Sequence, residues 1–286
     1  MSRIAIALMY LVHFLPVPLI RTLSAGVGHL LYWIGGSRRR VARTNLTLAF
    51  PDLEPQARER LVREVFVRFA QGVFDRAVLW YGSEKRLRDF VQVEGEEHML
   101  PLLGRPLILL APHFAGMEAG GTRISMDRQV VSLFANQKDP HFDRALRAGR
   151  SRFNDTILVS RQDSVRKAVR ELAKAIPFFY LPDMDLGPRD AVFVPFFGTP
   201  AATVTAVSRL AKLTGAAVVP CVTRMSGNGY VVRLFPAWEN FPSESLEEDA
   251  RRMNAFIEEQ VRTMPAQYHW LHRRYKTRPP GEPSLY

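Results

Sequence analysis

From about residue 91 onward, short apolar runs alternate with segments of helical periodicity, and this alternation restricts the fold more than any other feature of the chain. The run at 106–111 is continuously apolar, which is typical of a strand covered on both faces of a sheet. Strands that alternate with helices predict an α/β domain with a largely parallel central sheet flanked by helices. We predict strands at 91–94, 106–111, 130–135, 156–159, 178–181, 218–222 and 230–235, and helices at 54–80, 117–126, 142–153, 164–176, 203–213 and 244–264.

The amino-terminal segment is hydrophobic, and a single charge, Arg21, interrupts it between residues 4 and 37. One interpretation is a single anchor that spans the bilayer or dips into it, although Pro16 and Pro18 interrupt the first run. A second interpretation is a pair of helices, at 4–15 and 18–34, that lie in the membrane interface. A third is a buried helical hairpin of a soluble domain. We predict a hydrophobic membrane anchor over 1–36.

Charge supports this prediction. The cluster Arg38, Arg39, Arg40 and Arg43 directly follows the apolar segment and fits the positive-inside pattern, which places the rest of the chain in the cytoplasm. The whole chain has 39 Lys and Arg against 28 Asp and Glu, a net charge of +11, so its partners are expected to be anionic. The single cysteine, Cys221, excludes an internal disulfide and a zinc site built on thiolates, and it is expected to be a buried strand residue.

A candidate site follows the strand at 106–111. Ligands of open α/β sheets bind beyond the carboxyl ends of the strands, and His113 lies there. Glu118 falls in the first turn of the next predicted helix, within reach of the imidazole. A carboxylate bonded to one ring nitrogen makes the other nitrogen a better base, and the reference pKa of about 6.5 suits proton transfer at neutral pH.

These residues carry a resemblance to a known family. His113 and Glu118, with four residues between them, resemble the H-x4-D/E motif of glycerolipid-type acyltransferases. More specifically, the chain is similar over nearly its whole length to the late acyltransferases of lipid A biosynthesis. Two positions depart from the pattern: Met184 replaces a polar residue between two aspartates, and Met117 stands where a bulkier residue is frequent. The matching segments are 39–51, 148–152, 182–188, 192–198 and 265–279.

The resemblance implies a glycerolipid-acyltransferase-like fold, with the catalytic domain at 37–286, and a reaction without a cofactor. The donor is the fatty acyl thioester of acyl carrier protein, and the acceptor is a hydroxyl of an anionic glycolipid, a lipid A precursor of the Kdo2-lipid IVA type. His113 is expected to be the general base, Glu118 to orient its ring, and Arg150 to stabilise the oxyanion. The enzyme is expected at the inner membrane, on its cytoplasmic side, and nucleic acid is not an expected partner. The predicted substrate-binding residues are Arg147, Arg152, Asp183, Arg189, Arg273 and Arg274.

Other hypotheses remain open at this point. Asp183 and Asp185 also fit a turn-capping role before Gly187. An esterase is disfavoured because the chain has no Gly-x-Ser-x-Gly elbow, and a nucleotide enzyme because it has neither a Walker A loop nor a Gly-x-Gly-x-x-Gly fingerprint. An acyltransferase acting on another glycolipid, such as a phosphatidylinositol mannoside, and a non-enzymatic basic protein that binds membrane or nucleic acid are the remaining alternatives.

Overall fold

The computed structural model describes residues 2–160 and 166–286. Its centre is a seven-stranded sheet with the strand order β1-β9-β8-β2-β5-β3-β4, in which β8 and β9 pair antiparallel and the other described neighbours pair parallel. This confirms the predicted α/β fold with a largely parallel sheet. The strands are β1 (Val91–Glu94), β2 (Leu107–Leu110), β3 (Val131–Phe134), β4 (Ile157–Ser160), β5 (Phe178–Tyr180), β8 (Ala217–Ser226) and β9 (Gly229–Leu234).

The central strand β2 is covered on both faces, as its sequence predicted. Successive side chains of a strand point to opposite faces of the sheet. Ile108 and Leu110 join one apolar core, Leu107 and Leu109 join the other, and all four are fully buried. Two cores on one sheet hold β2 rigidly, so the residues that follow it start from a fixed point.

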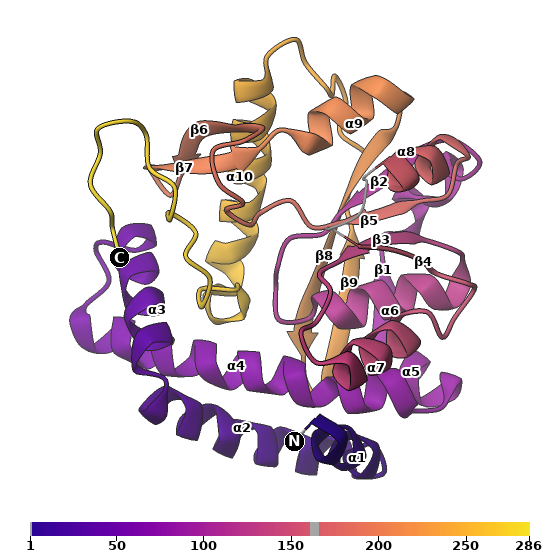
Figure 1. Ribbon diagram of the computed structural model, residues 1–286, viewed down its shortest axis with the longest axis vertical. Helices are drawn as coiled ribbons and strands as arrows, with labels where there is room; N and C mark the ends of the chain where they lie inside the picture. The colour runs from indigo at the N-terminus through magenta and orange to yellow at the C-terminus, as the bar shows by residue number, and fades with distance from the viewer. Residues whose placement is uncertain (1, 161–165) are drawn as a thin grey trace.

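The helices cover the sheet and extend beyond it. Figure 1 shows the long helix α4 crossing the molecule between the sheet and the helices α1 and α2. Most predicted helices are confirmed within a few residues; the first residues of the one predicted at 164–176 lie outside the described residues. The α-helices are α1 (Ser2–Val12), α2 (Val17–Ile34), α3 (Gly36–Ala49), α4 (Pro55–Tyr81), α5 (Glu84–Phe90), α6 (Met117–Asp127), α7 (Pro140–Arg150), α8 (Arg166–Ala173), α9 (Ala206–Thr214) and α10 (Leu246–Thr263).

One hairpin was not predicted. β6 (Ala191–Phe196) and β7 (Thr199–Val204) form a separate antiparallel pair that packs beside α10. The helix predicted at 203–213 therefore begins too early, because Thr203 and Val204 belong to β7. Proline in a strand pattern normally argues against a strand, and here Pro195 and Pro200 face each other across the hairpin.

The amino-terminal segment forms two helices, α1 and α2, whose bounds are close to the 4–15 and 18–34 of the second interpretation. α2 packs along α4 with one face, and the lone charge Arg21 points inward, where it donates to Asp75 at 2.5 Å while Tyr230 also donates to Asp75. The opposite face is apolar and open, so a fully buried hairpin is wrong. None of the helices in the described residues combines the length and the apolarity needed to cross a bilayer. Ten of the sixteen exposed large apolar side chains in the described part belong to this segment, namely Ile4, Leu8, Tyr10, Leu11, Phe14, Leu19, Leu23, Leu30, Trp33 and Ile34.

Candidate functional site

Two neighbouring strands bring His113 and Asp183 together. β2 and β5 pair in parallel with Leu110 opposite Tyr180, and His113 and Asp183 each follow three residues later. The backbone N–H of His113 donates to both Asp183 oxygens, at 3.1 and 3.0 Å, and Nδ1 lies 2.7 Å from Oδ1. No described residue forms a hydrogen bond with Nε2. A proton on Nδ1 therefore leaves Nε2 as a free acceptor.

Asp183 is held as a carboxylate. Its side chain is 1% exposed. Burial raises the pKa of this carboxyl, but the charge of His113 and the hydrogen bonds from it lower the pKa to about 2. An ionised Asp183 fixes the tautomer and the orientation of the imidazole. Two expectations for Asp183 are thus corrected: it is neither a turn cap nor a substrate contact, because its oxygens are occupied by His113.

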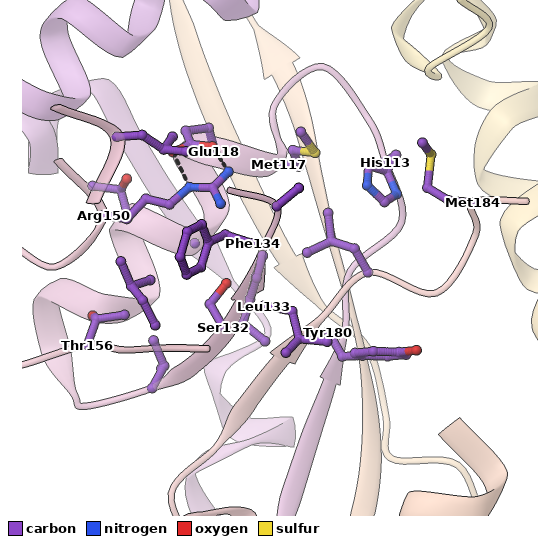
Figure 2. A pocket seen from close by; sticks show the side chains of 18 of the residues that line it. His113, Met117, Glu118, Ser132, Leu133, Phe134, Arg150, Thr156, Tyr180 and Met184 are labelled. Atoms are coloured by element: carbon purple, nitrogen blue, oxygen red, sulfur yellow. Dashed lines mark hydrogen bonds and ion pairs between the residues drawn. The ribbon is translucent and has the colours of Figure 1, made fainter. Parts of the chain in front are cut away.

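Glu118 has a different partner from the one predicted. Its two carboxylate oxygens accept Nε and Nη2 of Arg150 at 2.8 and 2.6 Å, a bidentate pair (Figure 2). Burial raises the pKa of Glu118, but Arg150 lowers it to about 2. The prediction that Glu118 orients the His113 ring is wrong, because both its oxygens are taken by Arg150 while Asp183 holds the ring.

A close helix contact sets this ion pair. A Cβ added at Gly149 would come within 2.4 Å of the Trp80 ring, so glycine lets the end of α7 approach α4. Arg150 is the next residue and the last of α7, and this approach brings its guanidinium to the first turn of α6. The ion pair of Glu118 and Arg150 is therefore built into the packing of three helices.

A cavity of about 310 Å³ opens beside these groups. Figure 2 shows His113 and the Glu118–Arg150 pair around it, with Ser132 and Thr156 on the side away from His113. Both positions that depart from the family pattern, Met117 and Met184, also line the cavity, where they contact whatever occupies it. Its walls are mostly apolar and include Val130, Leu133, Phe134, Phe142, Leu146, Leu158, Phe179 and Leu181.

The other predicted substrate contacts divide into two groups. Arg147, Arg189 and Arg273 are exposed, and of these Arg147 already donates to Asp143 at 2.6 Å and to Asn136 at 3.0 Å. Arg152 instead donates to the carbonyls of Leu79 and Gly82 at the end of α4.

Arg274 and Asp185 are structural. Arg274 is 2% exposed and donates to the carbonyl of Ala202 at 2.9 Å, so the prediction that it binds substrate is wrong. Asp185 accepts the N–H of Gly187 at 3.0 Å, which confirms it as a turn cap. Cys221 is buried in β8 as predicted, and burial raises the pKa of its thiol to about 12, which keeps it protonated.

Sequence reasoning missed Arg76. This residue of α4 lines the cavity together with His113, Glu118 and Arg150. A signal existed in the sequence: Val65, Phe69 and Val73 form an apolar stripe at helical spacing, and Arg76 continues the same face with a cation.

Comparisons with known proteins settle the family. Residues 2–277 match the model of a family described as bacterial lipid A biosynthesis acyltransferase. The chain belongs to this family. It is therefore an acyltransferase, and the hypothesis of a non-enzymatic binding protein is wrong.

Curated members of the lipid A acyltransferase family match the chain over nearly its full length. The lipid A biosynthesis lauroyltransferase of Escherichia coli (strain K12) is 33% identical, over 100% of this chain and 94% of that protein. The lipid A biosynthesis myristoyltransferase of the same organism is 31% identical, over 92% of this chain and 82% of that protein. Among solved structures, the 1-acyl-sn-glycerophosphate acyltransferase of Thermotoga maritima covers 86% of this chain and 96% of its own, with 16% identity and a TM-score of 0.41.

Proposed function

We propose that this acyltransferase moves a fatty acyl group from the thioester of acyl carrier protein to a hydroxyl of a lipid A precursor of the Kdo2-lipid IVA type, with His113 as the general base. The observation that carries the proposal is the His113–Asp183 pair at an apolar cavity in a chain of this family. The names of the relatives favour a lipid A acceptor over a phosphatidylinositol mannoside.

The reaction follows from the geometry of the pair. Nε2 of His113 removes the proton of the acceptor hydroxyl, and the oxygen attacks the thioester carbonyl, whose π electrons move to its oxygen. The tetrahedral oxyanion then collapses, the C–S bond breaks, and the imidazolium returns the proton to the leaving thiolate. The products are the new ester and the free thiol of the carrier. Asp183 stabilises the imidazolium between the two proton transfers, and Arg150, from within its ion pair, adds positive potential near the oxyanion.

The cavity suits the acyl chain of the donor. Its walls are mostly apolar, with a few charged groups among them: His113, Glu118, Arg150 and Arg76. A fatty chain in such a cavity leaves its thioester beside the base, His113. The acceptor then approaches from outside the cavity.

A basic rim supports a carrier protein as the donor. Lys138, Arg144 and Arg147 surround a shallow hollow at the start of α7, and Gln137 lines both this hollow and the main cavity. Acyl carrier proteins are acidic, so opposite charge favours docking at this rim. Arg189 and Arg273 are exposed and remain proposed contacts of the acceptor's phosphates.

The apolar face of α1 and α2 supports contact with a membrane. With Arg21 turned inward to Asp75, this face presents apolar side chains to solvent. Helices of this kind lie in the plane of the membrane interface with the apolar side buried. Arg40 of α3 is exposed and has no described partner, and it is available to anionic headgroups at the inner membrane. We propose that the catalytic domain lies on the cytoplasmic side, in keeping with the arginine cluster that follows the apolar segment.

The proposal is tested with the purified protein, acyl carrier protein loaded with chains of defined length, and a tetra-acylated lipid A precursor. Mass spectrometry should detect the addition of one acyl group, and the variant His113→Ala should not form the product. Mass spectrometry of lipid A from cells with and without the gene provides the second arm. An unchanged acylation pattern in both arms would overturn the proposal.

A further inference from the structure

Arg76 lies where two cavities meet. Besides the large cavity, a smaller one of about 60 Å³ lies between α4 and the carboxyl-terminal segment that includes His269. Four residues line both cavities: Arg76, His113, Met117 and Glu118. The acyl donor and the acceptor alcohol must meet at His113, so Arg76 borders the volume in which the bond forms.

The guanidinium of Arg76 is unusual in having no hydrogen-bond acceptor. Its Nε is buried and unpaired, and none of its nitrogens donates a hydrogen bond within residues 2–160 and 166–286. Arg76 as a whole is half-buried, and a cation in such a place without an acceptor is costly. Seven other arginines also have a buried unpaired Nε, but each donates through another nitrogen: Arg39, Arg58, Arg68, Arg123, Arg128, Arg274 and Arg278.

The nearby carboxylates already accept hydrogen bonds from residues other than Arg76. Both carboxylate oxygens of Glu118 accept hydrogen bonds from Arg150, and those of Asp183 accept from His113. Two guanidinium groups beside the cavity, those of Arg76 and Arg150, thus share the charge of one carboxylate, Glu118. Burial lowers the pKa of Arg76, the charge of Glu118 opposes this effect, and the charge of Arg150 adds to it. One positive charge is left without a counter-ion.

We propose that Arg76 is a catalytic residue that binds the thioester carbonyl oxygen as it becomes negative. This inference rests on the proposed function. When the acceptor oxygen bonds to the carbonyl carbon and its proton passes to His113, the π electrons of the carbonyl settle on its oxygen. Arg76 donates to that oxyanion until the C–S bond breaks and the carbonyl reforms. A preorganised donor that is unpaired in the ground state acts selectively on the transition state.

Kinetics separate this role from binding of a phosphate. We expect Arg76→Gln to lower kcat about 10²- to 10³-fold, with little change in KM for either substrate, and Arg76→Lys to restore part of the loss because it keeps the charge. Arg60→Gln is the matched control, since Arg60 is an exposed arginine on the same helix. A raised KM with unchanged kcat would assign Arg76 to a phosphate of the donor or the acceptor and overturn the proposal.

Stability provides a readout without substrate. Arg76 has no hydrogen bond to lose, only the Trp80 ring at 5.9 Å and the charge of Glu118, which the repulsion by Arg150 opposes. Arg76→Met should therefore unfold at the same or a higher temperature than the wild type. Unfolding at a clearly lower temperature would make Arg76 a structural residue and overturn the proposal. Failure of the proposed function looks different: the wild type itself would then acylate no lipid A precursor. If the wild type is active and Arg76→Gln retains full kcat, only the assignment of Arg76 fails.

Discussion

Nδ1 of His113 lies 2.7 Å from Oδ1 of Asp183, although 70 positions of sequence separate the two residues. The parallel pairing of β2 with β5 fixes this contact, because each residue lies three positions beyond a paired position. The geometry gives Asp183 the orienting part that sequence reasoning had given to Glu118.

Replacement of Asp183 tests this assignment. Asp183→Asn keeps the shape of the side chain but removes the charge that stabilises the imidazolium, so kcat should fall about 10²- to 10⁴-fold. Initial rates with a saturating donor measure the effect. Asp190→Asn is the control, because Asp190 is exposed, and it should retain the wild-type rate. Wild-type turnover by Asp183→Asn would rule out the pair as the catalytic base.

The ion pair between Glu118 and Arg150 predicts strong coupling in stability. Glu118→Ala leaves a largely buried guanidinium unpaired, at a cost of about 3–5 kcal/mol in the free energy of unfolding. The double variant Glu118→Ala/Arg150→Met should recover much of that loss, since the charge is gone. Urea denaturation of the two single variants, the double variant and the wild type measures the coupling. Additive losses would show that the two residues do not act as a pair.

Sequence reasoning identified the fold and His113, one residue of the proposed catalytic pair, for reasons that can be traced to particular residues. The runs at 106–111 and 178–181 are local signals, and they correctly gave β2 and β5. Which strands lie side by side is not local, so the meeting of His113 and Asp183 could not be derived from spacing. The strand end followed by Pro182 and Asp183 was nevertheless a usable signal.

Two further features were not predicted, each for its own reason. Arg150 and Glu118 are 32 positions apart, and their pairing depends on the contact of Gly149 with Trp80. The β6–β7 hairpin was hidden because its prolines mask the strand pattern. Family resemblance supplied the reaction, but it could not tell which arginines face the cavity and which, like Arg274, support the fold.

Acid stability should reflect two lowered pKa values. Asp183 and Glu118 both have pKa values of about 2 in the folded protein, below their ordinary values of 3.8 and 4.5. A carboxyl whose pKa is lower in the folded state adds stability above the unfolded pKa and loses it as the pH falls through the folded pKa. The free energy of unfolding should therefore decline as the pH drops from about 4.5 to 2, and less steeply in Glu118→Gln. Urea denaturation at stepped pH measures this, and parallel curves for the two proteins would contradict it.

The far side of the cavity should limit the length of the transferred chain. Ser132 is a small residue of β3 on the side away from His113. Ser132→Phe fills part of that volume, so the preferred donor should become shorter while the rate with the preferred chain is retained. Competition between acyl carrier protein thioesters of stepped length, read by mass spectrometry of the product, measures the preference. Asn136→Gln, in the shallow hollow outside the cavity, should leave it unchanged.

The proposed membrane contact through α1 and α2 predicts that a charge on their open face weakens vesicle binding. Leu11 is 60% exposed on this face, and burying one leucine in lipid contributes about 1.5–3 kcal/mol. Leu11→Asp should therefore lower the partition coefficient of the protein between vesicles and water at least about tenfold. Co-sedimentation with vesicles of mixed anionic and zwitterionic lipid measures this coefficient. Leu213→Asp is the matched control, because Leu213 is 71% exposed on α9, at the opposite end of the molecule from α1 and α2 (Figure 1). Equal loss in both variants would show that the effect is not local to this face, and no loss in Leu11→Asp would remove α1 from the membrane contact.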